Sequence, residues 1–197
     1  MGAVRPERLS DDTHEDDDWP RELRFLLERY PRATWPLATS PSVSFWLDVH
    51  DRLRHACAGL DLAADDYGHQ RITAAQLAVI APPRLRGLIA SVYSHHKIED
   101  IQYFPAFRRQ EPRLATGFDR LEREHAELAL EVDATVKALG ELRAAAERPA
   151  DSSAASAAAM AAERYLAASH SLCDHLRRHL TAEEALVVPI LLDYVEH

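Results

Sequence analysis

The sequence predicts an all-α protein, an up-down four-helix bundle with a helical extension at its N-terminus. The 197-residue chain has only six glycines, and its composition is dominated by alanine, leucine, arginine and glutamate, which favour helices. Four stretches place apolar side chains at the three- and four-residue spacing of a buried helix face. The length suffices for one domain with a core of its own.

The composition also narrows the possible partners and location. A formal net charge of −9 argues against nucleic acid or an anionic membrane surface as the partner. No apolar run approaches the roughly 18 residues of a membrane span, and the N-terminus lacks the apolar segment of a signal peptide. We therefore expect a cytoplasmic protein whose two cysteines, Cys57 and Cys173, are small reduced core residues.

One pattern occurs twice: a histidine, an acid four residues later and a proline six residues after the acid. On a helix, residues four apart lie one above the other, so each copy aims an imidazole and a carboxylate at the same point. A buried histidine and acid must both be satisfied, and a bound cation satisfies both. Two such helices facing each other predict a metal site. The two copies are His95, Glu99 and Pro105, and His179, Glu183 and Pro189.

The first copy has a competing pair, His96 and Asp100, rotated by one residue. We prefer His95 as the ligand because the second copy has leucine and glutamate where the first has His96 and Asp100. The neighbouring acid of each copy then becomes a candidate for orienting a ligand. On the last helix, His175 lies four residues before His179 and is the main alternative to it.

Two further histidines, His50 and His125, interrupt the apolar stripes of two other predicted helices, each three residues before a leucine. The chain thus looks like two halves, each supplying a helix with one histidine and then a helix with a histidine and a glutamate. The other histidines lack such a setting and are expected to be solvated: His14, His55, His69, His170 and His197.

An arm of residues 1–40 precedes the predicted bundle of residues 41–197. Its first 18 residues are acidic and polar and are expected to be mobile. Residues 19–31 predict a short amphipathic helix with Leu23, Leu26 and Leu27 on one face. This arm could cover the bundle or form a homodimer contact, and the sequence does not decide between them.

Capping residues and prolines set the predicted ends of the bundle helices. Thr73 and Gln76 predict a capping box for a short helix that is broken at Pro82 and Pro83. The low-complexity link of residues 149–159 can add turns to the start of the last helix. The first long helix is expected from Ser40 or Ser42 to Gly68, and the second from Arg84 to a bend or end near Pro105. The third is expected from Thr116, which forms a capping box with Asp119, to about Glu147. The fourth follows the link.

These motifs resemble the hemerythrin-like, or HHE cation-binding, domain family over roughly residues 41–197. The most specific segments are HHKIEDIQYFP and HLTAEEALVVP, with VHDRL and REHAEL on the single-histidine helices. The resemblance implies a four-helix bundle that holds two iron ions bridged by carboxylates and an oxygen species. It implies terminal imidazole ligands and bridging carboxylates at these positions: His50, His95, His125 and His179, and Glu99 and Glu183. The mixed ligand set suits two bridged ions better than one tetrahedral zinc, although manganese or zinc are also compatible with it.

One position departs from the oxygen-carrying members of that family, which have a second histidine four residues after the third-helix histidine. Here this position is Ala129, so one iron would have fewer protein ligands and room for water, peroxide or a nearby side chain such as Glu124, Tyr93 or His175. The departure favours reaction with O2, hydrogen peroxide or nitric oxide over reversible O2 carriage. The first hypothesis is therefore a reactive, catalase- or peroxidase-like di-iron protein. The alternatives are a non-catalytic iron or O2 sensor or store, and a plain bundle that binds nothing.

Overall fold

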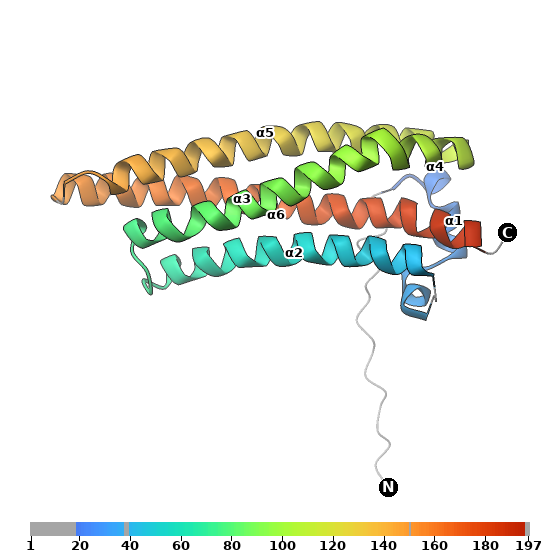
Figure 1. Cartoon of the computed structure of the whole chain (residues 1–197), viewed down its shortest axis with the longest axis horizontal. Helices are drawn as coiled ribbons and strands as arrows, with labels where there is room; N and C mark the ends of the chain where they lie inside the picture. Colours follow the sequence, from blue (N-terminus) through green and yellow to red (C-terminus); the bar gives the residue numbers. More distant parts are fainter. Residues whose placement is uncertain (1–18, 38–39, 150, 196–197) are drawn as a thin grey trace, which may run out of the picture.

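The computed structural model describes residues 19–37, 40–149 and 151–195, and over these ranges it is built of helices without a strand. The predicted mobile segment, residues 1–18, lies outside the described residues, as do His14 and His197. Four long helices run along the length of the molecule (Figure 1). They are α2 (Pro41–Gly68), α3 (Ala74–Ile98), α5 (Ala115–Ala146) and α6 (Ser152–Val195).

Each long helix packs beside the helix that precedes or follows it. Helix α2 contacts α3 and α6, and α5 contacts α3 and α6, which closes a four-membered bundle. Successive helices run in opposite directions (Figure 1), so the predicted up-down four-helix bundle is confirmed. Short turns join α2 to α3 and α5 to α6, and three short elements join α3 to α5: the π-helix η4 (Glu99–Tyr103), α4 (Phe104–Gln110) and the 3-10 helix η5 (Pro112–Leu114).

The N-terminal caps of α2 and α3 are those that the sequence predicts. The Ser40 hydroxyl accepts a hydrogen bond from the Val43 amide, and Pro41 occupies the first turn of α2, where its missing N–H has no helical partner to lose. Thr73 and Gln76 form the reciprocal capping box of α3.

The break predicted at Pro82 and Pro83 is wrong, because α3 runs through both prolines. Each proline removes one backbone donor of the helix. Tertiary packing outweighs the local cost because one apolar stripe is buried on both sides of the prolines. It consists of Leu77, Ala81, Leu85 and Leu88.

The predicted start and capping box of α5 are also wrong. Helix α5 begins at Ala115, one residue early and without a side-chain cap, because the η5 turn and the fully buried Leu114 lead directly into it. Asp119 accepts from Arg108 at 2.8 Å instead of forming a capping box. Near Pro105, where a bend or end of the helix is predicted, α3 has ended at Ile98, and the π-helix η4 leads into α4, whose first turn contains Pro105.

The N-terminal arm, described over residues 19–37, covers one end of the bundle. The single helix predicted there is divided into η2 (Arg21–Leu23) and α1 (Phe25–Arg29), followed by η3 (Arg32–Leu37). The three predicted leucines, Leu23, Leu26 and Leu27, are all buried, and α1 packs against α6. The Trp19 indole donates to the carbonyl of Ala182 in α6 at 2.9 Å. The arm therefore buries its apolar face within its own chain.

Two separate hydrophobic cores fill the bundle. The first, the loop-side core, lies towards the α2–α3 and α5–α6 turns and includes both cysteines, which are free thiols. The second, the arm-side core, joins the arm to the other end of the bundle. Large members of the loop-side core are Leu53, Leu85, Leu88, Leu128, Leu142, Tyr165, Leu172 and Leu176. Large members of the arm-side core are Trp19, Leu27, Trp35, Trp46, Phe104, Phe107, Phe118, Leu121 and Ile190.

A layer of buried polar side chains, called the polar layer, lies between these cores and includes a histidine from α2 and one from α5. His50 lies between Trp46 and Leu53, and His125 lies between Leu121 and Leu128, which belong to opposite cores. The polar layer is thus covered by apolar packing on both sides. Among the described residues, no helix is both long enough and apolar enough to span a membrane.

We predict that Leu27→Ala lowers the free energy of unfolding by about 2–5 kcal/mol, the usual cost of truncating a buried leucine. Leu27 is 6% exposed in the arm-side core. The matched control is Leu62→Ala, because Leu62 is 57% exposed and its truncation should change stability by less than about 0.5 kcal/mol. Chemical denaturation of the full chain measures both. Equal stability of the two variants would mean that the arm is not docked.

Candidate metal centre

The polar layer brings together all six residues that the sequence predicts as ligands, and it adds His96. Two groups of side chains each have their ligand atoms within 4.8 Å of one another. The two-histidine group contains His50, His95, Glu99 and Glu183, and the three-histidine group contains His96, His125 and His179. Helix α2 supplies His50, α3 and η4 supply His95, His96 and Glu99, α5 supplies His125, and α6 supplies His179 and Glu183.

His95 and His96 both point inward because α3 touches two neighbouring helices. The stripe of His95 and Glu99 faces α2, where the His95 and His50 rings lie 5.0 Å apart. The stripe of His96 and Asp100 faces α5, where the His96 ring stacks on His125 at 3.8 Å and 7°. The two stripes are alternatives in the sequence, but in the bundle both His95 and His96 enter the polar layer.

Glu99 and Glu183 lie between the two groups. Both carboxylates are 0% exposed, and each turns one oxygen towards each group. The distances from Glu183 are 3.4 Å from Oε1 to His50 Nε2 and 3.5 Å from Oε2 to His179 Nε2. Those from Glu99 are 3.0 Å from Oε1 to His95 Nδ1 and 3.6 Å from Oε2 to His125 Nε2. This is the arrangement that a carboxylate needs to bridge two cations.

Three carboxylates outside the two groups hold histidine rings on the side that faces away from the inner layer. Each accepts a hydrogen bond from an Nδ1–H group, which leaves the lone pair of Nε2 directed into the layer. The pairs are His50 with Glu184 at 2.9 Å, His125 with Asp100 at 2.8 Å and His179 with Glu124 at 3.0 Å. Asp100 and Glu184 are the acids beside the predicted ligands, and each orients a histidine on another helix.

The inner atoms of the layer lack hydrogen-bond partners among the described residues. They are both carboxylate oxygens of Glu99 and of Glu183, and the Nε2 atoms of His50, His95 and His96. The Nε2 atoms of His125 and His179 lie 3.1 Å apart, although the Nδ1 bonds point both lone pairs at each other. Buried acceptors without donors are costly. A cation in each group satisfies them, so the residues fit bound metal ions.

Burial and neighbouring charges set the protonation of the layer. Burial lowers the pKa of His95 to about 4 and that of His125 to about 3, so both rings are neutral at pH 7 and able to bind a cation. Burial also opposes the charged form of His50, but Glu183 and Glu184 outweigh it and raise its pKa to about 9. Burial, together with the charge of Glu183, raises the pKa of Glu99 well above its usual value.

The alternative residues of the sequence analysis lie outside the two groups. His175 bonds to Glu131 at 3.1 Å. Tyr93 is exposed, and Glu124 accepts a hydrogen bond from the outer nitrogen, Nδ1, of His179. The three histidines predicted to be solvated within the described ranges, His55, His69 and His170, are exposed.

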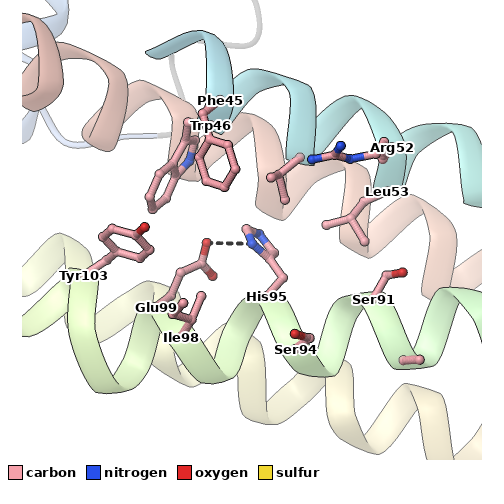
Figure 2. A pocket seen from close by; sticks show the side chains of 12 residues that line it. Phe45, Trp46, Arg52, Leu53, Ser91, Ser94, His95, Ile98, Glu99 and Tyr103 are labelled. Atoms are coloured by element: carbon pink, nitrogen blue, oxygen red, sulfur yellow. Dashed lines mark ion pairs between the residues drawn. The ribbon is translucent and has the colours of Figure 1, made fainter. Parts of the chain in front are cut away.

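Two grooves reach the layer from opposite sides of α3. The first, of about 500 Å³, lies between α2 and α3 and ends at His95 and Glu99 (Figure 2). Its walls are largely apolar or aromatic and include Phe45, Trp46, Leu53, Ile98 and Tyr103. The second, of about 610 Å³, lies between α3 and α5, ends at His96 and His125, and includes Ala129, Lys97 and Asp133.

Comparison with known proteins agrees with this geometry. The family model of the hemerythrin HHE cation-binding domain matches residues 42–191. The chain belongs to the hemerythrin HHE cation-binding domain family. No curated protein and no solved structure gave a significant match. The matched range contains the whole polar layer, so the groups that can hold metal ions lie within a domain of a cation-binding family.

We predict that divalent metal ions stabilise the wild-type protein but not a Glu99→Gln, Glu183→Gln double variant. Free metal at 100 times its Kd should add about 2.7 kcal/mol to the stability of a site that exists only in the folded chain. The neutral amides cannot bridge cations, but they relieve buried charge, so the metal-free variant should be at least as stable as the metal-free wild type. Thermal unfolding with chelator and with added metal measures both effects. Equal metal-induced shifts in Tm would contradict the assignment of these carboxylates.

Proposed function

We propose that this protein is a non-haem di-iron protein that binds and reacts with a small oxidant or diatomic molecule, namely O2, hydrogen peroxide or nitric oxide. Peroxide decomposition of the catalase or peroxidase type is the reaction to test first. One observation carries the proposal: two fully buried carboxylates, Glu99 and Glu183, each face both histidine groups and have no hydrogen-bond donor in the part of the chain that the structure describes. A layer of this kind in a bundle suits two cations that share bridging ligands.

The donor types support iron as the resident metal. Imidazole nitrogens and carboxylate oxygens in a mixed set suit iron, whereas a closed tetrahedral zinc site has four ligands around one ion. Two iron ions would supply Lewis acidity and reversible oxidation to the site. Manganese and zinc remain compatible with the donors, so metal analysis is part of the test.

The protein's own residues would hold and shield such a pair. Asp100, Glu124 and Glu184 fix the ring orientations of three histidines, which keeps Nε2 free to bind. The two apolar cores limit water on both sides of the layer, and the groove between α2 and α3 leaves an approach to His95 and Glu99. A molecule as small as O2, nitric oxide or hydrogen peroxide fits this approach, whose lining combines aromatic side chains with Arg52, Ser91 and Ser94.

A non-catalytic iron or O2 sensor is the second candidate, because the arm contacts one of the carboxylates that orient the histidines and reaches a second one through Arg120. Arg32 in the arm lies 3.5 Å from Glu184 and donates to the Thr181 carbonyl at 2.7 Å. On the other side, the Trp19 ring lies 4.5 Å from the guanidinium of Arg120, which pairs with Glu124 at 2.7 Å. A change in the charge of the layer would therefore reach the arm through two chains of polar contacts.

We predict that protein purified aerobically contains about two irons per chain, as expected for a bundle with two sets of ligands. It should show an oxo-bridge absorption and should evolve O2 from hydrogen peroxide. A Glu99→Ala, Glu183→Ala double variant should lose the iron, the absorption and the reaction. His175→Ala is the matched control and should keep all three, because His175 pairs with Glu131 outside both groups. Metal analysis, visible spectroscopy and an oxygen electrode make the measurements.

The outcomes separate the candidate functions. Bound iron without peroxide turnover would favour the sensor. A colourless protein that takes up no iron when it is offered would refute both candidates and leave a bundle whose polar layer has a structural role.

A further inference from the structure

We propose that Cys57 and Cys173 are a redox-active dithiol, which hydrogen peroxide or another oxidant of the peroxide class converts to a disulfide between α2 and α6. The pair belongs to the loop-side core and not to the two groups of the polar layer. This inference goes beyond the proposed function, because the oxidation requires no bound metal ion.

The two thiols face each other from neighbouring helices. Helix α2 supplies Cys57, α6 supplies Cys173, and these helices pack against each other. Both cysteines are 0% exposed in the same core, and the Cys173 thiol donates a hydrogen bond to the Cys57 sulfur. They are the only cysteines of the chain. Two free thiols in hydrogen-bonding contact need only a small shift of their side chains to form a disulfide.

A partly exposed ion pair lies beside the thiols. It joins Asp61 and Arg177, which follow Cys57 and Cys173 by one turn on their own helices. Helical side chains tilt towards the N-terminus of their helix, so both charged groups lean back to the level of the thiols, and both charges act on both sulfurs. The Asp61 and Arg177 side chains are 41% and 32% exposed. Such a pair adds little stability, so it opens readily and admits a molecule as small as hydrogen peroxide.

The surroundings make Cys57 the more reactive thiol. The hydrogen bond from Cys173 lowers the pKa of the Cys57 thiol, and the charge of Arg177 acts in the same direction against the effect of burial. The same hydrogen bond, together with burial, raises the pKa of the Cys173 thiol. The thiolate is the nucleophile in thiol oxidation. Cys57 therefore attacks the oxidant, and Cys173 reacts with the product of that attack.

The reaction has two steps. The Cys57 thiolate attacks one oxygen of hydrogen peroxide, the O–O bond breaks, and the sulfur becomes a sulfenic acid. The other oxygen leaves as hydroxide and takes up the proton that Cys57 has lost, which gives water. The Cys173 sulfur then attacks the sulfenic sulfur, the S–O bond breaks, and the oxygen leaves as a second water with the Cys173 proton. In total, two thiols and one peroxide give one disulfide and two waters.

The disulfide ties together two helices that both contribute to the polar layer. Helix α2 supplies His50, and α6 supplies His179 and Glu183. The chain between the two cysteines includes all of α3 and α5, so the disulfide closes a long loop and strongly restricts the unfolded chain. The oxidised protein is therefore expected to resist unfolding better than the reduced protein.

The first test identifies the product of oxidation in the full chain. Reduced protein, as purified, is exposed to hydrogen peroxide that is supplied continuously, so that decomposition by a bound metal does not exhaust it. Mass spectrometry should show a monomer that has lost two hydrogen atoms. Digestion should give one pair of peptides joined through Cys57 and Cys173, which dithiothreitol separates. Oxidation of Met160, which is 63% exposed, is distinguished because it adds an oxygen atom.

The second test measures the stability of the disulfide form. The cross-link should raise Tm by about 5–15 °C relative to the reduced protein, and dithiothreitol should reverse the shift. Both forms are measured with a chelator, so that their metal content is equal. A lower Tm of the oxidised form would mean that the disulfide strains the bundle, and it would overturn the assignment of the pair as a dithiol that the fold is built to oxidise.

Three variants test the geometry and the two roles. Leu172→Cys combined with Cys173→Ser keeps two thiols but turns one of them by about 100° around α6, so the disulfide should form at least about tenfold more slowly than in wild type. Cys173→Ser should accumulate a sulfenic acid at Cys57, which dimedone traps. Cys57→Ser should give at least about tenfold less of this adduct at Cys173. Thermal unfolding first shows that each variant is folded.

The wild-type result decides the inference even if a variant does not fold. Thiols that stay reduced in the folded protein, although the same oxidant links them in the unfolded chain, would show that the inference is wrong. A disulfide-linked dimer as the main product would do the same. An adduct mainly at Cys173 would overturn the assignment of the two roles. Because the thiols lie outside the metal centre, each of these results leaves the proposed function standing.

Discussion

The rest of the structure depends on two buried carboxylates, Glu99 and Glu183, which have no hydrogen-bond donor within residues 19–37, 40–149 and 151–195. A lone charge in an apolar interior costs several kcal/mol, so the bundle must bring positive charge to them. It does so from four helices: the rings of His50 and His95 face one side, and those of His125 and His179 face the other. Cations bound in the layer would balance the carboxylate charges better than protons on the histidine rings, because one cation can be shared by several acceptor atoms.

The same constraint explains why the bundle has two cores. Apolar packing on each side of the polar layer offsets the free-energy cost of burying its polar groups. The same packing limits the access of water to the layer. Helix α6 links both parts: Leu176 and Leu180 lie in the loop-side core, and Leu186 and Ile190 lie in the arm-side core. His179 and Glu183 lie on the same helix, where the members of the two cores meet. The arm contributes aromatic and leucine side chains to the second core and so covers the end nearest the layer.

The outer carboxylates connect the layer to the surface. Glu184 accepts a hydrogen bond from His50 and forms an ion pair with Arg54 at 2.8 Å. Glu124 likewise accepts a hydrogen bond from His179 and forms an ion pair with Arg120. These paired charges keep the pKa values of both acids low despite burial, so the acids remain acceptors that fix the ring orientation. The ring orientation within the polar layer thus depends on residues that lie outside the two histidine groups.

The sequence by itself determined the class of the fold and most of the layer. The apolar spacing predicted the four helices, and the repeated His-x-x-x-Glu pattern predicted Glu99 and Glu183, because residues four apart on a helix share a face. Only the tertiary structure decided the rest. The two stripes of α3 meet different neighbours, so His95 and His96 both enter the layer, and helical phase alone could not show this. Likewise, the buried stripe through Pro82 and Pro83 overrode the local breaking signal, and the docked position of the arm followed from packing that no local pattern encodes.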